Sequence, residues 1–280
     1  MSPCKAAARR CRTRRPGLSV VVPAWNEAER IAECLDRLSA ALRALPAEVV
    51  VVDDGSTDGT AAVCRGWITR HPRAAVRLLR QPHAGKGAAV YRGARATRGD
   101  AVAYLDADLD VPAEEVARLF ALRRREGVDV LVGSKRLLTW RGSGRPVLRT
   151  ALSITFSWVA RTLFHLPIRD TQTGIKMWPG PWLRTVARRT SVRGFLFDLE
   201  LLGAASDDGL RLAEVGVEVR MRRRASRLGL ADVGRCLLEL PAVGRSLRSL
   251  RGRCAAPGGP APRRRVLSRR PLSLHATRVG

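Results

Sequence analysis

Short apolar runs rich in β-branched residues alternate with stretches of helical periodicity through the first half of the chain. The apolar runs lie at residues 18–23, 48–52, 76–79, 101–105 and 128–132. Between the first two runs, apolar residues recur every three or four positions, at Ile31, Cys34, Leu35, Leu38, Leu42 and Leu45. This stripe predicts an amphipathic helix that needs a sheet face to cover. The alternation as a whole predicts an α/β fold with a mostly parallel sheet and crossover helices.

The second half of the chain is less regular. Its pattern predicts a helix at residues 147–164, a polar turn at 170–176, a helix at 197–205 and a strand at 212–219. A chain of 280 residues can bury a large core, and the motifs favour one domain over two. We therefore predict one domain at residues 18–230, a C-terminal helix at 231–250, and basic tails at 1–17 and 251–280.

The net charge of +26 is carried by arginine, because the only lysines are Lys5, Lys86, Lys135 and Lys176. A coding bias toward arginine explains the scarcity of lysine but not the net charge. The two tails contain no acidic residue and hold about half of the excess. We predict disordered tails, for which an anionic membrane surface or nucleic acid is a candidate contact. No specific nucleic-acid partner is expected.

The cysteines and the apolar segments indicate a cytoplasmic protein. The six cysteines show no zinc-ligand or redox spacing, which fits a reducing compartment. The apolar run at 18–22 is too short for a signal peptide and ends at Pro23. The nearest candidate for a membrane span, residues 147–166, is interrupted by Arg149 and Arg161. It reads better as an interfacial or buried amphipathic helix, so we expect no bilayer span.

Unusual polar residues follow four of the predicted strands. They lie at 26–27, 53–54, 83–87 and 106–110. Ligands of parallel α/β sheets bind at the carboxyl ends of the strands, so these residues are candidates for one site. Asp106 and Asp108, directly after a buried run, suit a divalent cation that also holds a diphosphate. Asp110 could be a third ligand or the cap of the helix that follows Pro112, and the two alternatives have about even weight.

Two further strand ends suit a nucleotide. The carboxylates of Asp53 and Asp54 can accept hydrogen bonds from a base or a ribose, while Ser56 or Thr57 can cap the next helix. Lys86 lies in a small-residue turn at a helix start, which fits an anionic donor. Because Lys86 is followed by Gly87 rather than Ser or Thr, the turn is not an NTPase P-loop.

Together these segments resemble the family 2 inverting glycosyltransferases of GT-A fold, a Rossmann-like α/β architecture. The resemblance rests on VVPAWNE at 21–27, VDDGSTDGT at 52–60, GKGAAV at 85–90 and DADL at 106–109. Within the family, DTQTGIK at 170–176 is similar to the DTQCGFK of the dolichyl-phosphate glucosyltransferase and polyprenyl-phosphate glycosyltransferase branch. FDLELL at 197–202 and EVGV at 214–217 extend that similarity, which covers residues 18–230.

The resemblance implies a role for each matching residue. The nucleotide-sugar donor would contact Pro23, Glu27, Asp53, Asp54, Lys86 and Asp106. Mg²⁺ or Mn²⁺ would be held by Asp106, Asp108 and Asp110, and catalysis would involve Asp108, Arg149 and Lys176. The acceptor side would comprise Lys135, Arg136, Ser153, Gln172, Asp198 and Glu200. The family's arginine in Gly-Ser-Arg is either replaced by Lys135 or shifted to Arg136.

The activity that the resemblance implies is inverting transfer of a hexose from a nucleotide diphosphate sugar to a polyprenyl or dolichyl phosphate. Glucose, and UDP-glucose as donor, are favoured. A lipid phosphate is already an anion and needs no strong base, whereas a soluble or glycolipid hydroxyl would need Asp198 or Glu200. Both residues could instead be structural. A catalytically retired basic module that binds membrane or nucleic acid is the alternative from another class.

The predicted location is the inner face of the membrane, as a peripheral protein. The basic run at 220–227 fits docking on anionic lipid, although a solvated surface explains it equally well. Many relatives of this branch carry transmembrane anchors, which we do not expect in this sequence. A membrane-anchored partner protein is therefore a candidate partner.

Overall fold

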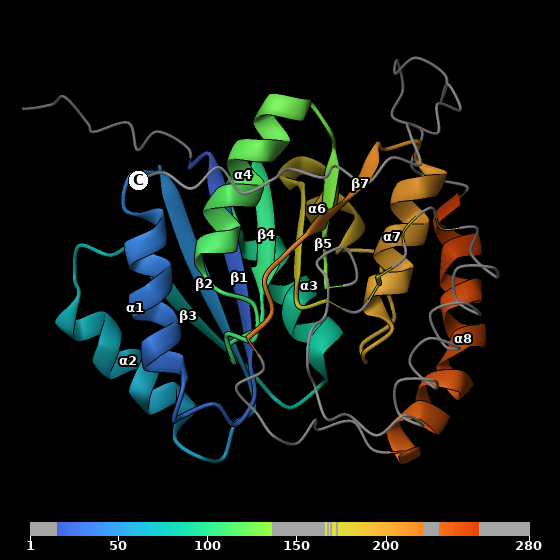
Figure 1. Ribbon diagram of the computed structural model, residues 1–280. Coiled ribbons are helices and arrows are strands. Elements are labelled where there is room, and N and C mark those ends of the chain that lie inside the picture. Colours follow the sequence, from blue (N-terminus) through green and yellow to red (C-terminus); the bar gives the residue numbers. More distant parts are fainter. Residues whose placement is uncertain are drawn as a thin grey trace, which may run out of the picture.

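A mixed, mostly parallel sheet forms the centre of the computed structural model (Figure 1). The structure describes residues 16–135, 166, 168, 170–171, 173–220 and 230–251, with the side chains of the last helix from residue 239 on. The strands of this part follow the order β3-β2-β1-β4-β6-β5-β7. They are β1 (Leu18–Ala24), β2 (Ala47–Asp54), β3 (Val76–Gln81), β4 (Ala101–Leu105), β5 (Val130–Ser134), β6 (Ile175–Pro179) and β7 (Leu212–Gly216).

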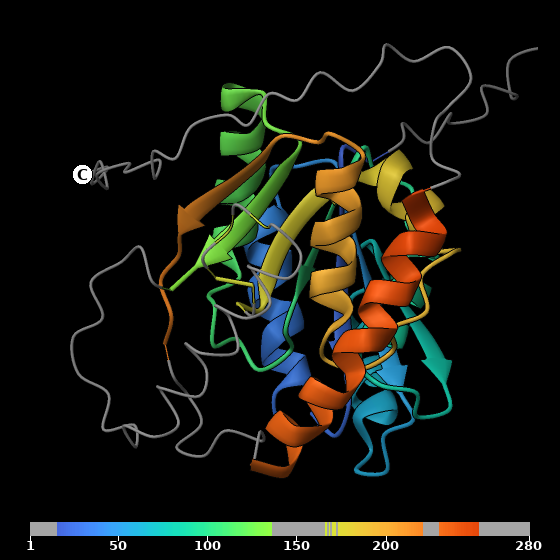
Figure 2. The ribbon, with the colours of Figure 1, turned by 90° about the vertical axis from the view of Figure 1, so that its right-hand side faces the viewer.

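Helices cover both faces of the sheet (Figures 1 and 2). One face carries α1 (Ile31–Leu42), α2 (Thr60–Arg70) and α4 (Glu114–Glu126). The other face carries α3 (Lys86–Ala96), α6 (Gly180–Val186), α7 (Phe197–Asp207) and α8 (Leu230–Arg251). Side chains alternate along β1, so that Val20 and Val22 join the core under α1 while Val21 joins the core under α3. This arrangement confirms the predicted α/β fold.

The predicted stripe of the first helix is buried, with Ile31, Cys34, Leu35, Leu38 and Leu42 all in the core. Leu45, the last predicted member, lies beyond the helix and is partly buried. The strand predicted at 128–132 is found at Val130–Ser134, and the strand predicted at 212–219 ends at Gly216. Helix α8 occupies the region where a C-terminal helix is predicted. The helix predicted at 147–164 lies outside the described residues.

Strand β6 corrects the sequence prediction. The sequence predicts a polar turn at 170–176, but residues 175 and 176 begin a strand that runs antiparallel to both β4 and β5. The strand has only five residues, and the charged Lys176 interrupts its apolar pattern. Such a short segment carries little periodic signal, so its pairing partners decide its conformation. None of the described helices combines the length and the hydropathy that a bilayer span requires.

Candidate active site

The loops that follow β1 and β2 are joined by hydrogen bonds between their polar residues. Asn26, in a left-handed backbone conformation with φ 54°, accepts a hydrogen bond from the Thr57 amide at 2.9 Å. The Asn26 amide donates to the Ser56 hydroxyl at 3.0 Å, and the Glu27 amide donates to Thr60 Oγ1 at 2.9 Å. These contacts correct one prediction: neither Ser56 nor Thr57 caps α2, since Gly59 holds the N-cap position.

The two carboxylates at the end of β2 are buried and have protein partners. Asp54 accepts hydrogen bonds from the amides of Ala84 and Gly85, at 3.0 and 2.9 Å, and from the Gln81 side chain. Its Oδ2 lies 2.9 Å from His83 Nδ1. Asp53 pairs with Arg80 at 3.1 Å. The end of β2 therefore shapes the turn that precedes α3, and contact of Asp53 or Asp54 with a nucleoside stays a prediction.

The other predicted donor residues lie at the end of β1. Pro23 is half-buried and is aligned with Val52 of β2. Glu27 is 8% exposed and lies 3.6 Å from Arg30. Trp25, between them, is 41% exposed and stacks on His83, with the ring centroids 4.6 Å apart. Sequence reasoning missed this stacked pair, because the two residues belong to loops 58 positions apart.

The acidic end of β4 faces the lysine at the start of α3. Lys86 Nζ lies 2.7 Å from Oδ1 of Asp106 and 2.9 Å from Oδ2. Burial alone would lower the pKa of Lys86, but the charges of Asp106 and Asp198 raise it above its usual value. Asp108 Oδ1 accepts a hydrogen bond from the Asp110 amide. The structure thus brings together the predicted phosphate-binding lysine and the predicted metal carboxylates.

The electrostatics of this end suit a cation. Burial, followed by the negative charges of Asp106 and Asp110, raises the pKa of Asp108 from 3.8 to about 6. A bound cation would remove that repulsion. Among the described residues no three His, Cys, Asp or Glu side chains form a ready-made metal cluster. The residues fit an ion that takes one or two carboxylates and completes its coordination with water and a diphosphate.

Asp110 is not the cap of α4, which corrects one of its two predicted alternatives. The helix begins at Glu114 and has Ala113 at its N-cap. The Asp110 carbonyl instead accepts a hydrogen bond from the Arg220 amide at 2.7 Å, which ties the loop after β4 to the chain beyond β7. Its role as a third metal ligand stays a prediction.

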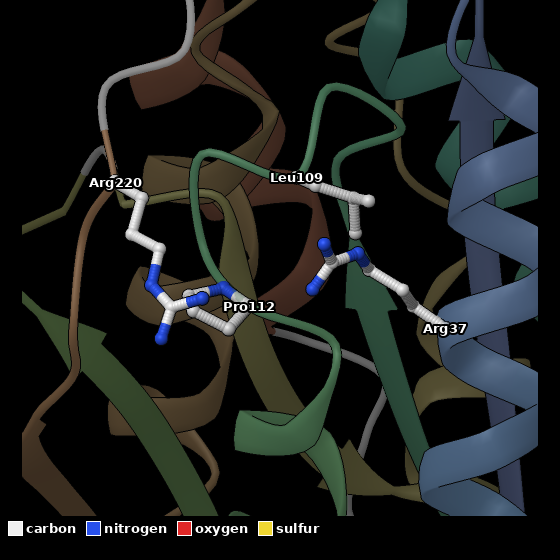
Figure 3. A pocket seen from close by; sticks show the side chains of 4 residues that line it. All are labelled: Arg37, Leu109, Pro112 and Arg220. Carbon is white, nitrogen blue, oxygen red and sulfur yellow. The ribbon is translucent and has the colours of Figure 1, made fainter.

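A small pocket lies beside the loop that carries these carboxylates (Figure 3). Arg37 of α1 and Arg220 flank it, with Leu109 and Pro112 between them. Arg37 is paired with Glu33 at 2.9 Å and Arg220 with Glu218 at 2.7 Å. Asp106 and Asp108 are not among the residues that line the pocket. The pocket is therefore not the predicted metal and diphosphate site.

Lys176 is completely buried in a cluster of polar side chains. Its Nζ lies 3.0 Å from Oδ2 of Asp198 and donates to the Tyr104 hydroxyl at 2.7 Å and to the Thr173 carbonyl at 3.0 Å. Tyr104 in turn donates to Asp198. Sequence reasoning missed Tyr104, because a tyrosine inside an apolar strand looks like ordinary core.

Glu200 is also fully buried and accepts hydrogen bonds from four donors. They are the amides of Ser191 and Val192 and the hydroxyls of Tyr91 and Ser246. The Glu200 carboxylate therefore joins α3, α7, α8 and the loop before α7. This network is a structural arrangement that no local pattern indicated.

The remaining acceptor-side residues are only partly described. The Lys135 amide donates to Asp170 at 3.2 Å, which joins the end of β5 to the segment before β6. Arg136, Arg149, Ser153 and Gln172 lie outside the described residues.

Comparison with known proteins places these features in a family. Residues 19–170 match the model of glycosyl transferase family 2. A dolichyl-phosphate beta-glucosyltransferase of Trichomonas vaginalis is 34% identical over 71% of this chain and 62% of its own length. Another, of Drosophila melanogaster, is 33% identical over 71% of this chain and 66% of its own length. The chain thus spans just under two thirds of each of these relatives.

The fold also has solved relatives. A glucosyl-3-phosphoglycerate synthase from Mycobacterium tuberculosis, in complex with Mn²⁺, UDP-glucose and phosphoglyceric acid, superimposes with a TM-score of 0.61. The match has 24% identity and covers 84% of this chain and 80% of that one. With its mostly parallel sheet and joined acidic strand ends, the chain belongs to glycosyl transferase family 2 and has the GT-A fold.

Proposed function

We propose that the protein transfers a hexose from a nucleotide diphosphate sugar to a polyprenyl phosphate, with inversion at the anomeric carbon. Glucose is the favoured sugar and UDP-glucose the favoured donor. The similarity to dolichyl-phosphate beta-glucosyltransferases over 71% of the chain supports this choice. The ion pair between Lys86 and Asp106 supports a diphosphate-binding site at this strand end.

The burial of Asp198 and Glu200 is the observation that favours a phosphate acceptor. Their exposed fractions are 3% and 0%, and both carboxylates are occupied by neutral or cationic donors of the protein. A hydroxyl acceptor needs a base that reaches the hydroxyl proton, at about 2.6–3.2 Å or through one water. A phosphate acceptor is already ionised and needs none. Asp198 and Glu200, the two candidate bases, are therefore better explained as structural residues.

In the proposed reaction the protein orients the donor and neutralises its leaving group. Lys86 would contact the diphosphate, where a fixed positive charge stabilises the negative charge that develops as the sugar departs. A divalent ion held by Asp106 and Asp108, with Asp110 as a predicted third ligand, would supply further positive charge when bound. Exposed Trp25 offers a flat ring next to His83 on which the nucleotide base would stack.

The acceptor would reach the site from the surface of a membrane. We propose a peripheral position on the cytosolic, inner face, supported by the basic run at 220–227 and the basic tails. Arg149 and Ser153, separated by four positions, would lie on one helix face toward the two phosphates. A membrane-anchored partner protein is a further part of the proposal.

Transfer from labelled UDP-glucose to polyprenyl phosphate, compared with the polyprenol of the same length, tests the function. The full chain is incubated with Mn²⁺ or Mg²⁺, and the anomeric configuration of the product is read by NMR. We expect transfer to the phosphate only, with inversion, and no transfer by an Asp108→Ala variant. Transfer to the alcohol but not the phosphate would overturn the proposed acceptor. Salt-sensitive nucleic-acid binding without nucleotide-sugar binding would favour the retired module instead.

A further inference from the structure

Asp106 is attached to the start of β6. The antiparallel pairing of β4 and β6 aligns Leu105 with Ile175, and it continues one residue further as the Asp106 amide donates to the Gly174 carbonyl at 3.1 Å. The backbone of Asp106 therefore has a fixed partner although it lies beyond the end of β4. Its position depends on where the turn at 173–174 lies.

The side chain of Asp106 depends on the same turn. A Cβ added at Gly174 would overlap the side chain of Asp106, because its three nearest atoms would be Oδ2, Cγ and Cβ of that residue. The same carboxylate is held by Lys86, whose Nζ lies 2.7 Å from Oδ1 and 2.9 Å from Oδ2. Gly174 leaves the carboxylate room and Lys86 attracts it, so a side chain at 174 would move it.

A buried ion pair contacts the backbone of the turn at 173–174. Lys176 Nζ donates to the Thr173 carbonyl at 3.0 Å, while Asp198 of α7, 3.0 Å away, balances the charge of the lysine. The Tyr104 hydroxyl, from β4, contacts both charged groups. Thr173 makes a second hydrogen bond, in which its hydroxyl donates to Asp170 at 2.7 Å.

This burial separates Lys176 and Asp198 from any substrate. Lys176 is fully buried, Asp198 is 3% exposed, and each has several partners in the protein. Burying two charges is unfavourable unless the geometry satisfies them, and a buried pair that is satisfied in this way can fix one arrangement of its surroundings. Here the ion pair determines the conformation of the turn at 173–174, which contacts Asp106.

We propose that Gly174 and the Tyr104–Lys176–Asp198 cluster are positioning residues that place the Asp106 carboxylate for the metal and diphosphate of the donor. The inference rests on the proposed function, which assigns Asp106 to that donor. Neither Lys176 nor Asp198 contacts substrate, and Lys176, predicted from the sequence as a catalytic group, acts through Thr173 and Gly174.

Gly174→Ala tests the inference directly, and Gly203→Ala is its matched control. A Cβ at Gly203, on α7, would approach the Leu247 side chain of α8 to 2.7 Å, so the added methyl group is crowded there too, but its nearest atoms all belong to Leu247 and none to Asp106. Binding of Mn²⁺ together with UDP is measured by calorimetry, without turnover, beside the melting temperature. We expect Gly174→Ala to weaken this binding about tenfold or more, while Gly203→Ala lowers only the melting temperature.

Asp106→Asn in the same assay distinguishes failure of the inference from failure of the proposed function. If Asp106→Asn abolishes binding of Mn²⁺ with UDP but Gly174→Ala binds like the wild type, the positioning role is overturned and the proposed function stands. If Asp106→Asn also binds like the wild type, Asp106 does not hold the donor, and both are overturned.

A paired replacement tests Lys176 itself. Lys176→Met combined with Asp198→Asn removes both charges and leaves neither one buried alone. A positioning role predicts weaker binding of Mn²⁺ with UDP, a raised KM for the donor and residual kcat, with Tyr104→Phe shifting the same quantities less. Wild-type binding together with complete loss of kcat would show that at least one of Lys176 and Asp198 is a catalytic residue, and it would overturn the inference.

Discussion

Replacing Asp108 by asparagine should stabilise the metal-free protein while removing its affinity for the metal. Asp108 carries a carboxylate whose pKa rises from 3.8 to about 6 on folding, through burial and the charges of Asp106 and Asp110. Such a rise means that the ionised form opposes folding, by about 3 kcal/mol above pH 6 if taken in full. Asparagine removes this cost and can still accept the hydrogen bond of the Asp110 amide, which is 3.1 Å long.

The expected gain is smaller than the full value, because Asp108 is only half-buried and solvent screens its neighbours. We expect about 1–2 kcal/mol at pH near 7.5, which corresponds to a rise in melting temperature of roughly 2–8 °C. The direction in which this gain changes with pH follows from the pKa of Asp108 in the unfolded and in the folded protein. The folded protein binds the extra proton between about pH 6 and pH 4, so the wild type recovers stability as the pH falls through that window.

Thermal unfolding in EDTA, recorded at about pH 7.5, 5 and 4, measures this prediction. The gain should shrink as the pH falls and vanish near pH 4. Glu114→Gln is the control, since it removes an equally charged but exposed residue from the first turn of α4 and should give no gain. Added Mn²⁺ should stabilise the wild type and not Asp108→Asn. A gain that is absent at pH near 7.5, or equal at all three values, would refute the reasoning.

Three further predictions concern other buried or paired groups. Lys86→Met should weaken UDP binding about 10- to 100-fold by calorimetry, because a charged partner of the diphosphate is lost; unchanged affinity would contradict its donor role. Glu200→Gln should lower the stability by about 1–3 kcal/mol, because its amide would face the donors that the carboxylate satisfies; lost activity at unchanged stability would instead indicate a base. Burial raises the pKa of Cys34 and, to about 12, that of Cys64, so maleimide should label these two only in denaturant; rapid labelling of either one in the folded protein, located by peptide mass spectrometry, would contradict this.

Much of the site could be predicted from the sequence, because the carboxyl ends of parallel strands meet at one edge of a sheet. The polar groups after β1, β2, β3 and β4 were each visible as an interruption of an apolar run. Contacts such as Asn26 with Ser56 and Lys86 with Asp106 lie at the shared edge that this rule predicts. The period of the apolar residues and the position where a strand ends are local properties, so a single sequence displays them directly.

The tertiary structure decided the roles of the residues that lie far apart in the chain. Nothing local shows that Ile175–Pro179 pairs with β4, since the two strands are separated by about 70 residues and the pairing is antiparallel within a mostly parallel sheet. The partners of Lys176 come from β4, α7 and the turn before β6, so its burial could not be read from its neighbours in sequence.

The sequence by itself determined the α/β fold, the acidic strand ends and the family, because periodicity and the order of motifs lie along the chain. The tertiary structure decided that Asp110 does not cap α4, that Asp198 and Glu200 are enclosed, and that a glycine lies against Asp106. The physical reason is that burial of a charge is a property of its surroundings. Those surroundings are assembled only when distant elements pack together.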